Sequence, residues 1–574
     1  MGNEEQRRGR QLYALHWWIM IKILFCLILL IASPCFAVDY SWYFSESTGH
    51  DTEGDGTQET PWKTINKINS QILTMTEGTD SATIYLKRGD TWTGALSTAW
   101  INVRKSNVTI TAYGSGDKPI LDGAGVTPEG VTGGDIPYGY FIKVGNGTSA
   151  TVTNVHVSNI RITNGYPGGG IQFSGADSTY NATGPGSVTN CELYDLGWSA
   201  IALYKIGNYG GSANAIKLEN NSITTINEYC RVNAWTMGWP QAIQGNMSGS
   251  TYGHEARYNV ISDVYGEGIG AQGFSVIEYN DISSTKAPGI YVSNGSGNSP
   301  DITTAVRYNI VWRNSSDSYT LSSGIRVDDE GSSGDNAGYS VEVYGNVVAG
   351  DFYSGIDVRN GAGTSNWDSV KVYNNTIIDC DRNLVVSKPQ FFTVLDIRNN
   401  ASIIHSDAAS AAVHLSVWNA TSYSELTTIG PNLWSGDGYA SETDLPADWR
   451  DGANVFGSAS LGKTSGWRSI TAVPGLSDFT PVASSDMIQN ANAADLGASY
   501  DDYVNNDGSA IQAWEGLPAT EDFPTATQAA SWTFGAILTE PPQGEPETGN
   551  TGLRINSNAG KLLRHSSGGV FKWQ

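Results

Sequence analysis

The chain has 574 residues with 67 glycines, and 16% of its residues are charged. A typical domain carries about 25% charged residues and about 7% glycine, so this composition argues against long helices and coiled coils. The formal net charge of −24 would repel the phosphate backbone of a nucleic acid, so we expect no nucleic-acid partner.

Residues 1–37 have the pattern of a secretory signal peptide. Basic residues precede an apolar run at 23–32, and Cys35 and Ala37 supply the small residues of a cleavage site. The run is shorter than the roughly 20 apolar residues that a membrane span requires, although an uncleaved anchor helix is the alternative. We therefore expect cleavage after Ala37, no membrane span in the mature chain, and a secreted or cell-surface location.

Residues 38–100 are expected to form an N-terminal cap. Thr60 is a candidate helix N-cap and Pro61 a candidate first helical residue. The spacing of the following apolar residues would place them on one face of that helix: Trp62, Ile65, Ile68 and Ile72. Such a helix would close the exposed end of a repeat structure.

A short motif of Asn followed closely by Ile, Val or Leu recurs through residues 101–436. The Asn residues are Asn159, Asn190, Asn221, Asn259, Asn280, Asn309, Asn346, Asn375 and Asn400. Their spacing indicates stacked supersecondary units. We interpret them as structural, because Asn tolerates a left-handed turn and stacked copies can hydrogen-bond to each other.

A second element follows most of these motifs, namely a small residue and then a period-two aliphatic alternation. Examples are Gly170-Ile171, Ala200-Ile201, Gly268-Ile269, Gly289-Ile290, Gly324-Ile325 and Gly355-Ile356. This period indicates strands that are too short to form a core alone but can pair with the coils above and below. The sequence therefore predicts an all-β, right-handed parallel β-helix.

The regular spacing ends near residue 436. Residues 437–539 are expected to form a less regular C-terminal closing region, and residues 540–574 a polar linker with a short tail. Cys191 and Cys230 are candidates for a disulfide, which the sequence does not fix.

Several motifs resemble those of secreted bacterial right-handed β-helix proteins of the pectate-lyase-like superfamily. They are Gly54-Asp55-Gly56-Thr57, Thr60-Pro61-Trp62-Lys63-Thr64-Ile65, Arg88-Gly89-Asp90-Thr91, Ala112-Tyr113-Gly114-Ser115-Gly116 and Trp532-Thr533-Phe534-Gly535-Ala536-Ile537. The resemblance covers most of residues 40–540 and supports the same fold. It does not select an activity, because that superfamily includes lyases, hydrolases and non-catalytic surface proteins.

Candidate site residues follow from aligning the second strand of each repeat on its aliphatic residue. One outward column then contains Tyr291, Arg326 and Asp357, and the next contains Tyr204, Asp328 and Arg359. Further charged residues follow these strands: Asp329, Glu330 and Lys388. This concentration of charge indicates either a site or a solvated surface ladder in which Arg326 faces Asp357 and Asp328 faces Arg359.

Two chemistries fit the cluster. A lyase would use Arg326, Arg359, Lys388 or Tyr291 to neutralise a uronate carboxylate and remove the neighbouring proton. Carboxylates would then hold a cation such as Ca²⁺, with Asp329 and Glu330 as the primary candidates and Asp328 and Glu267 as further ones. A glycoside hydrolase would instead pair Asp328 with Asp357, or Glu267 with either of them.

Other residues are weaker candidates. Trp235 and Trp239, in a long loop, and Tyr204 and Tyr291, on the strand face, could contact a sugar, although loop aromatics also pack against their own fold. Glu267 is either a site carboxylate or, as we favour, a solvated turn residue. Acidic turns at 51–55 and 501–507 are further candidates for Ca²⁺.

We rank three functions on this basis. The first is an extracellular lyase that cleaves an acidic polysaccharide by β-elimination. The second is a glycoside hydrolase with paired carboxylates, and the third is a non-catalytic surface or adhesive protein. The expected partner is a polysaccharide substrate or a cell-surface glycan, and the sequence does not indicate an oligomeric state.

Overall fold

The computed structural model describes residues 17, 18, 20 and 22, most of residues 37–469, and residues 553–556, 561–566 and 569–571. The gaps within 37–469 are 95–98, 125–138, 146–150, 166–167, 175–183, 207–214, 228–240, 248–252, 294–302, 314–321, 329–339, 361–366, 390–391, 406–411, 419–426, 431, 437–440, 446–453, 458, 460, 462–464 and 466.

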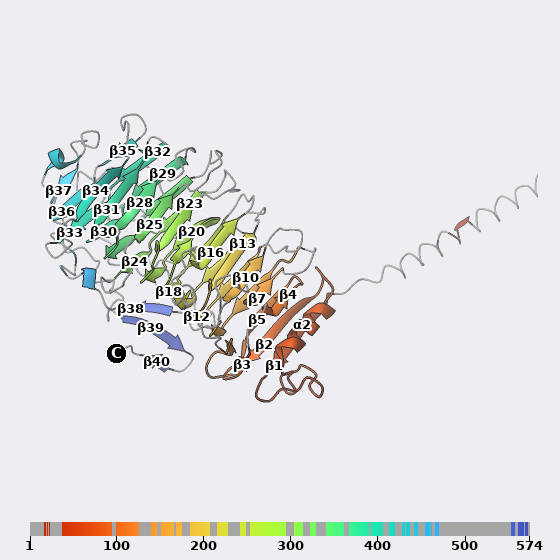
Figure 1. Ribbon diagram of the computed structural model, residues 1–574. Coiled ribbons are helices and arrows are strands. Elements are labelled where there is room, and N and C mark those ends of the chain that lie inside the picture. Colours follow the sequence, from red (N-terminus) through yellow and green to blue (C-terminus); the bar gives the residue numbers. More distant parts are fainter. Residues whose placement is uncertain are drawn as a thin grey trace, which may run out of the picture.

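Three long parallel sheets form the described body (Figure 1). The 13-stranded sheet A contains β1 (Asp39–Phe44), β2 (Ser81–Lys87), β5 (Val108–Tyr113), β8 (Val155–Ser158), β11 (Gly186–Thr189), β14 (Ile216–Glu219), β17 (His254–Arg257), β20 (Phe274–Glu278), β23 (Thr303–Arg307), β26 (Ser340–Tyr344), β29 (Trp367–Tyr373), β32 (Phe392–Arg398) and β35 (Thr427–Ile429).

The 13-stranded sheet B contains β3 (Thr91–Thr93), β6 (Ile120–Asp122), β9 (Arg161–Thr163), β12 (Glu192–Leu196), β15 (Ser222–Ile226), β18 (Val260–Val264), β21 (Asp281–Ser283), β24 (Ile310–Arg313), β27 (Val347–Gly350), β30 (Thr376–Ile378), β33 (Ala401–Ile404), β36 (Leu433–Gly436) and β37 (Val455–Phe456). The 11-stranded sheet C contains β4 (Ala99–Val103), β7 (Tyr140–Val144), β10 (Gly169–Ser174), β13 (Ile201–Ile206), β16 (Gln241–Met247), β19 (Glu267–Gly270), β22 (Ile290–Ser293), β25 (Ser323–Asp328), β28 (Ser354–Arg359), β31 (Arg382–Ser387) and β34 (Val413–Trp418).

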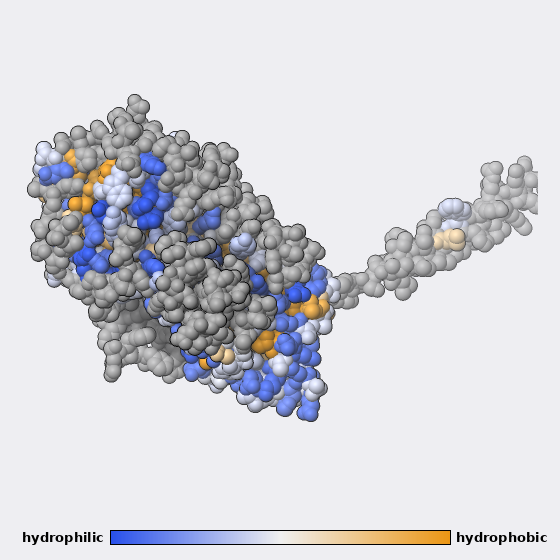
Figure 2. Space-filling view, in the orientation of Figure 1, coloured by the Kyte–Doolittle hydropathy of each residue, from blue (hydrophilic) through white to orange (hydrophobic). Residues whose placement is uncertain are grey.

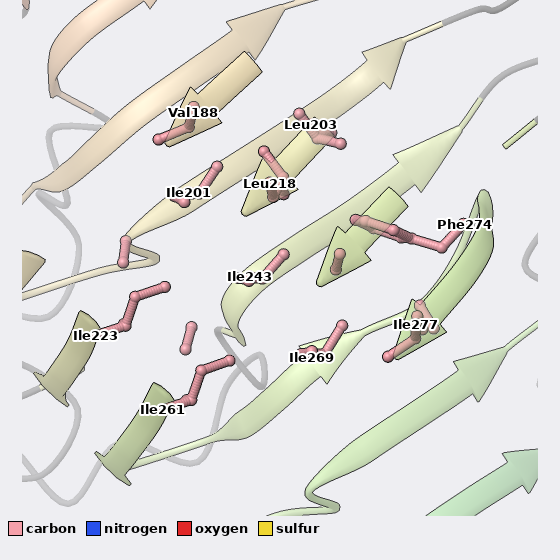
Figure 3. Close-up of a cluster of buried hydrophobic side chains, with 14 of the residues drawn as sticks. Val188, Ile201, Leu203, Leu218, Ile223, Ile243, Ile261, Ile269, Phe274 and Ile277 are labelled. Atoms are coloured by element: carbon pink, nitrogen blue, oxygen red, sulfur yellow. The ribbon is translucent and has the colours of Figure 1, made fainter. Parts of the chain in front are cut away.

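From β2 to β36, successive strands along the chain belong to sheets A, B and C in turn, and strands of neighbouring coils pair in parallel. This is the parallel β-helix that the sequence predicts. The coils share one hydrophobic core, into which aliphatic side chains from all three sheets point (Figure 3), such as Val188 of sheet A, Ile223 of sheet B and Ile243 of sheet C. Parallel pairing suits these Val- and Ile-rich strands because β-branched side chains pack well on a pleated surface.

From β10 to β28, the small residue before the core isoleucine of each sheet C strand has a packing reason. A Cβ atom on Gly324 would lie 2.2 Å from Cγ1 of Val348 and 2.8 Å from the carbonyl oxygen of Gly355. A larger side chain there would force the sheet C and sheet B strands apart, so Gly324 occupies a position that suits a very small residue.

The capping helix begins later than the sequence suggests. Helix α2 spans Ile65–Thr74, and its N-cap is Thr64, whose hydroxyl accepts a hydrogen bond from the amide of Lys67. The prediction of Thr60 as N-cap and Pro61 as first helical residue is therefore wrong. The chain is still extended at Trp62, which bridges in parallel to Phe44, and this pairing delays the helix.

Helix α2 is nevertheless attached to the first strand of sheet C. Ile68 and Ile72 are buried in the main core, as the spacing predicts. Asn69 donates a hydrogen bond from Nδ2 to the carbonyl of Trp100 at 2.6 Å and accepts one from the amide of Asn102 at 2.8 Å. These bonds provide partners for two backbone groups at the open edge of β4, where an unpaired strand could otherwise pair with a strand of another chain.

A ladder of buried asparagines runs through the described coils. The ladder consists of Asn221, Asn259, Asn280, Asn309, Asn346, Asn375, Asn400, Asn432 and Asn454. Oδ1 of Asn309, for example, accepts bonds from both the amide and Nδ2 of Asn280, and Nδ2 of Asn309 donates to Oδ1 of Asn346. The side chains thus satisfy turn backbone groups that would otherwise be buried without partners.

Asn159 and Asn190 are not part of this ladder. Both adopt left-handed backbone conformations, with φ of 58° and 55°. In the coil of Asn190, the position that matches the ladder is the next residue, Cys191, whose amide donates a hydrogen bond to Oδ1 of Asn221. The sequence motif therefore includes asparagines with two different structural roles, and it omits Asn432 and Asn454 at the C-terminal end of the ladder.

The residues after the last coil pack back over sheet B. A second hydrophobic cluster lies on the outer face of sheet B and includes Trp312, Val347, Ile378 and Leu433. Trp467, in the short 3₁₀ helix η6 (Trp467–Ser469), belongs to the same cluster and is buried. Arg468 extends this attachment by pairing with Asp351 and Asp381.

The remaining described elements are small. A 3₁₀ helix, η4, spans Glu442–Asp444, and the tail contains an antiparallel sheet of β38 (Leu553–Asn556), β39 (Lys561–Ser566) and β40 (Gly569–Phe571). Cys191 is buried and free, and Cys230 lies outside the described residues. No described helix is long and apolar enough to cross a membrane. Figure 2 shows a mainly hydrophilic described surface around the N-terminal coils, with hydrophobic residues in small areas.

We predict that Asn309→Ala lowers the free energy of unfolding by about 3 kcal/mol or more. The substitution leaves the amide and Nδ2 of Asn280 without their acceptor, and each buried orphan costs about 1–3 kcal/mol. Urea unfolding followed by circular dichroism measures the change. Asn159→Ala is the control, since it removes a residue suited to a left-handed turn and two long, half-buried hydrogen bonds from Nδ2 to the hydroxyls of Thr111 and Ser158, but no ladder bond, and should cost about 1–2 kcal/mol. Equal losses for both variants would contradict the ladder.

A second prediction concerns His254, which begins β17 and is fully buried. Its Nδ1 accepts the amide hydrogen bond of Ile216 at 3.1 Å, and burial lowers the pKa of the ring from 6.5 to about 4. The unfolded chain therefore binds a proton first as the pH falls, so this contribution to stability is complete above pH 6.5 and is lost toward pH 4.

The expected loss from this residue between pH 7 and pH 4.5 is about 2–3 kcal/mol. The free energy of unfolding is measured with urea at both pH values. The difference between the two values should be smaller in His254→Asn than in the unmodified chain by about 2–3 kcal/mol. An unchanged pH dependence in the variant would show that His254 is protonated normally in the folded protein.

Candidate functional site

The outer face of sheet C carries the predicted columns. The first column is in continuous register through Gln172, Ala202, Gln244, Gly270, Tyr291, Arg326, Asp357 and Val385. In the second, Ser293, Asp328, Arg359 and Ser387 stand opposite one another on successive strands. Because adjacent strands lie about 4.8 Å apart, the side chains of these strands form one contiguous surface.

Asp357 is the centre of this surface. Its Oδ2 lies 3.2 Å from Nε of Arg326, and its Oδ1 accepts a hydrogen bond from Nε of Arg359 at 3.0 Å. A second nitrogen of Arg359, Nη2, donates to Oδ2, so the Arg359 contact is bidentate. One carboxylate therefore holds two guanidinium groups from adjacent strands.

Two serines complete the surroundings of Asp357. Ser323 and Ser354 are paired in register, their hydroxyls lie 2.7 Å apart, and they donate to Oδ2 at 3.2 and 3.3 Å. Ser323 also accepts a bond from Nη2 of Arg326 at 3.0 Å. Neither serine stands out in the sequence, because serine is common in turns and on strand surfaces.

Asp328 makes a second contact with the same guanidinium group. Its Oδ2 lies 3.7 Å from Nε of Arg359. Burial alone would lower the pKa of Arg359, but the charge and hydrogen bonds of Asp357, together with Asp328 and Tyr291, raise it above its usual value. Arg359 therefore carries its positive charge at every physiological pH.

The acidic and basic members of this cluster differ in exposure. The Asp357 side chain is 0% exposed and that of Asp328 is 8% exposed, whereas those of Arg326 and Arg359 are 20% and 23% exposed. The predicted pairing of Arg326 with Asp357 and of Asp328 with Arg359 is present, but the description of it as a solvated ladder is wrong. Neighbouring side chains and strands cover the carboxylates, and the guanidinium groups form the accessible surface.

Tyr291 and Lys388 lie on either side of this cluster. Tyr291 stands in register opposite Arg326, is buried, and is close enough to Arg359 to influence its pKa. Lys388 directly follows Ser387, the residue opposite Arg359, and is half-buried. Its backbone is left-handed, with φ of 54°, and its amide donates to the carbonyl of Trp418.

Glu267 is not the solvated turn residue that we favoured from the sequence. It is the first residue of β19, it is buried, and its Oε2 accepts a hydrogen bond from Nε2 of Gln241 at 2.6 Å. It lies on the strand that precedes β22, so its position is roughly 10 Å from β25 along the helix axis. It therefore lies apart from the arginine cluster.

The other sequence candidates are separated from the cluster or outside the described residues. Tyr204 is half-buried on β13, roughly 19 Å from β25 along the axis. Trp235, Trp239, Asp329 and Glu330 all lie outside the described residues.

The described part of this surface does not suit a divalent cation. Asp357 and Asp328 face guanidinium groups, which would repel Ca²⁺. Within the described residues, no group of three His, Cys, Asp or Glu side chains is arranged to hold a metal ion. Any calcium site here would depend on Asp329 and Glu330.

The acidic turn at 51–55 has a structural role in this fold. Asp51 accepts hydrogen bonds from the amides of Lys63 and Thr64 at the start of α2. Asp55 accepts bonds from the Thr60 and Thr57 side chains and from the Thr57 amide, which lower its pKa to about 2. The second acidic turn, 501–507, lies outside the described residues.

Comparisons with known proteins add little about activity. No family model and no curated protein matches the chain. Among solved structures, a GH136 lacto-N-biosidase from Eubacterium ramulus is similar over 68% of each chain, with 12% identity and a TM-score of 0.37. An alginate lyase from Paenibacillus sp. is similar over 69% of this chain and 94% of its own, with 12% identity and a TM-score of 0.22. Likeness at this level does not assign an activity, so the assignment depends on the chemistry of the sheet C face.

We predict that Asp357→Asn lowers the free energy of unfolding by about 3–5 kcal/mol. The change removes the buried charge that compensates Arg326 and Arg359, and breaking a buried ion pair typically has a cost of this size. Urea unfolding of the full chain provides the measurement.

The control for that prediction is Glu46→Gln. Glu46 pairs with Lys63 at 3.5 Å, with both side chains almost half exposed, so its loss should change stability by at most about 1 kcal/mol. A cost for Asp357→Asn as small as that of the control would show that the buried carboxylate does not hold the cluster together.

Proposed function

We propose that this chain is an extracellular carbohydrate-active enzyme that cleaves an acidic polysaccharide by β-elimination on the outer face of sheet C. The observation that supports this proposal is the pair of accessible guanidinium groups of Arg326 and Arg359 above the buried carboxylate of Asp357. The extracellular location depends on the signal peptide predicted for residues 1–37.

The arrangement fits an anionic substrate for an electrostatic reason. A chain with a net charge of −24 repels polyanions over most of its surface, so a binding site for one needs local positive donors. Asp357 and its serine partners fix the orientation of both guanidinium groups before substrate arrives. Preorganised donors stabilise developing negative charge better than mobile ones.

The proposed reaction uses these groups in sequence. Arg326 and Arg359 hold the uronate carboxylate, which makes the neighbouring carbon acid easier to deprotonate. Lys388, the more exposed of the two candidate bases, removes that proton, while Tyr291 lies beside the guanidinium groups. Electrons from the broken C–H bond form a carbon–carbon double bond, and the glycosidic oxygen leaves with a proton from Lys388 or water.

The carboxylates do not favour hydrolysis by Asp328 and Asp357. A glycosidase needs one carboxyl group that can reach and protonate the glycosidic oxygen. Asp357 is completely buried and Asp328 is nearly so, and both face guanidinium groups. In the proposed site, they position the arginines.

Incubation with polysaccharides tests the proposed reaction. The purified mature chain is incubated with uronate-containing and neutral polysaccharides, once with Ca²⁺ and once with chelator, and ultraviolet absorbance and reducing ends are followed. We expect both signals to rise together on a uronate-containing polymer. Reducing ends without absorbance would indicate a hydrolase instead, and no signal on any polymer would indicate a non-catalytic surface protein.

Substitutions then test the assigned residues. We expect Arg359→Lys to lower kcat/KM at least 100-fold, because a lysine cannot make the bidentate contact with Asp357 and present further donors. Lys388→Ala should lower kcat similarly with little change in KM, and added small amines should partly restore the rate.

The matched control for these variants is Lys371→Ala. Lys371 pairs with Glu342 on sheet A, away from the proposed site, and its loss should leave activity unchanged. Full activity in both Arg359→Lys and Lys388→Ala would move the site elsewhere on the protein.

A further inference from the structure

Three side chains form a compact group at the C-terminal end of the sheet C face. The guanidinium carbon of Arg382 lies 4.2 Å from the ring centroid of Tyr353 and 5.5 Å from that of Trp418. The two ring centroids are 6.4 Å apart with an interplanar angle of 51°. All three side chains are half-buried, so each keeps part of its surface exposed to solvent.

Strand register connects this group to the arginine cluster. Arg359 stands opposite Ser387, and Ser387 stands opposite Trp418, the last residue of β34. Trp418 therefore lies roughly 10 Å along the helix axis from Arg359, on the same outward column. Tyr353 directly precedes β28, and Arg382 begins β31, so the group borders the candidate site.

Arg382 differs electrostatically from the other two arginines of this face. Arg326 and Arg359 are paired with buried carboxylates, whereas no carboxylate of the described chain lies within ion-pair distance of Arg382. The adjacent carboxylate, Asp381, pairs instead with Arg468 at 3.0 Å. Burial raises the pKa of Asp381 and the nearby charge of Arg382 lowers it in part, so these two groups interact without forming an ion pair, and the Arg382 guanidinium remains oriented to donate to an external anion.

We propose that Tyr353, Arg382 and Trp418 form a subsite that binds one uronate ring of the polysaccharide next to the cleavage position. This inference rests on the proposed function, since it assigns a neighbouring part of the same substrate. The indole of Trp418 packs against the C–H face of the sugar ring, and Arg382 donates hydrogen bonds to its carboxylate. Contacts with both rings hold the guanidinium in place, which reduces the entropy lost on binding.

Isothermal titration calorimetry tests the subsite with the full mature chain. The probes are oligogalacturonate and oligoalginate hexasaccharides, together with their carboxyl-reduced, neutral counterparts. The measurements are made in the Lys388→Ala background to suppress turnover. We expect Arg382→Gln to raise the Kd for one of the uronate oligosaccharides about tenfold or more, with little effect on its neutral counterpart. Trp418→Ala should raise the Kd for both forms, and Trp418→Phe should recover part of the loss.

The control is Tyr279→Ala, which disrupts a comparable aromatic stack, in which the Tyr279 ring centroid lies 5.2 Å from those of Tyr258 and Tyr308. These three tyrosines lie at the turns that directly follow the sheet A strands β17, β20 and β23, away from the sheet C face, so the substitution should leave every Kd unchanged. Unaltered binding in both Arg382→Gln and Trp418→Ala would overturn the subsite, as would equal effects of Arg382→Gln on the charged and neutral probes.

The outcomes also separate this inference from the proposed reaction. If elimination depends on Arg359 but substitution of Arg382 and Trp418 does not change the Kd for the oligosaccharides, the proposed reaction stands and the subsite is rejected. If the chain shows no elimination activity but binds uronate in a way that depends on Arg382, the proposed reaction is rejected and the subsite stands as a binding site. No binding of any probe would overturn the subsite.

Discussion

Parallel hydrogen bonding between coils, held in register by buried asparagines, is the constraint on which the other features depend. Each ladder asparagine satisfies a turn amide of the preceding coil and a carbonyl farther back, so a coil cannot shift by one residue without leaving buried polar groups unpaired. In a strand, such a shift would also exchange the inward and outward side chains. The ladder therefore keeps the same face of every sheet C strand toward solvent.

The candidate site uses that register to place opposite charges on adjacent strands. Asp357 can bind Arg326 and Arg359 together because one stands opposite it and the other lies two residues along its own strand. Burial of the carboxylate strengthens these contacts and leaves the guanidinium groups as the accessible part. Arg382 shows the complementary arrangement, in which aromatic rings rather than carboxylates hold the charge in place.

Period-two alternation and repeated asparagines were sufficient to predict the fold and the pairing of Arg326 with Asp357. They do not predict burial, because exposure depends on the neighbouring coils, and for this reason the expectation of a solvated Glu267 is wrong. The start of α2 was misplaced because Trp62 extends the strand pairing before the helix begins. Tyr353, Arg382 and Trp418 come from separate segments, and only the folded structure brings them together.

The claim that the sheet C face is the functional surface is tested most directly by a crystal structure of the Lys388→Ala chain with a uronate hexasaccharide that it binds. We expect a sugar chain along β25, β28, β31 and β34, with carboxylates at Arg326 and Arg359 and at Arg382. A sugar chain on sheet A or sheet B, with the sheet C face empty, would contradict this claim.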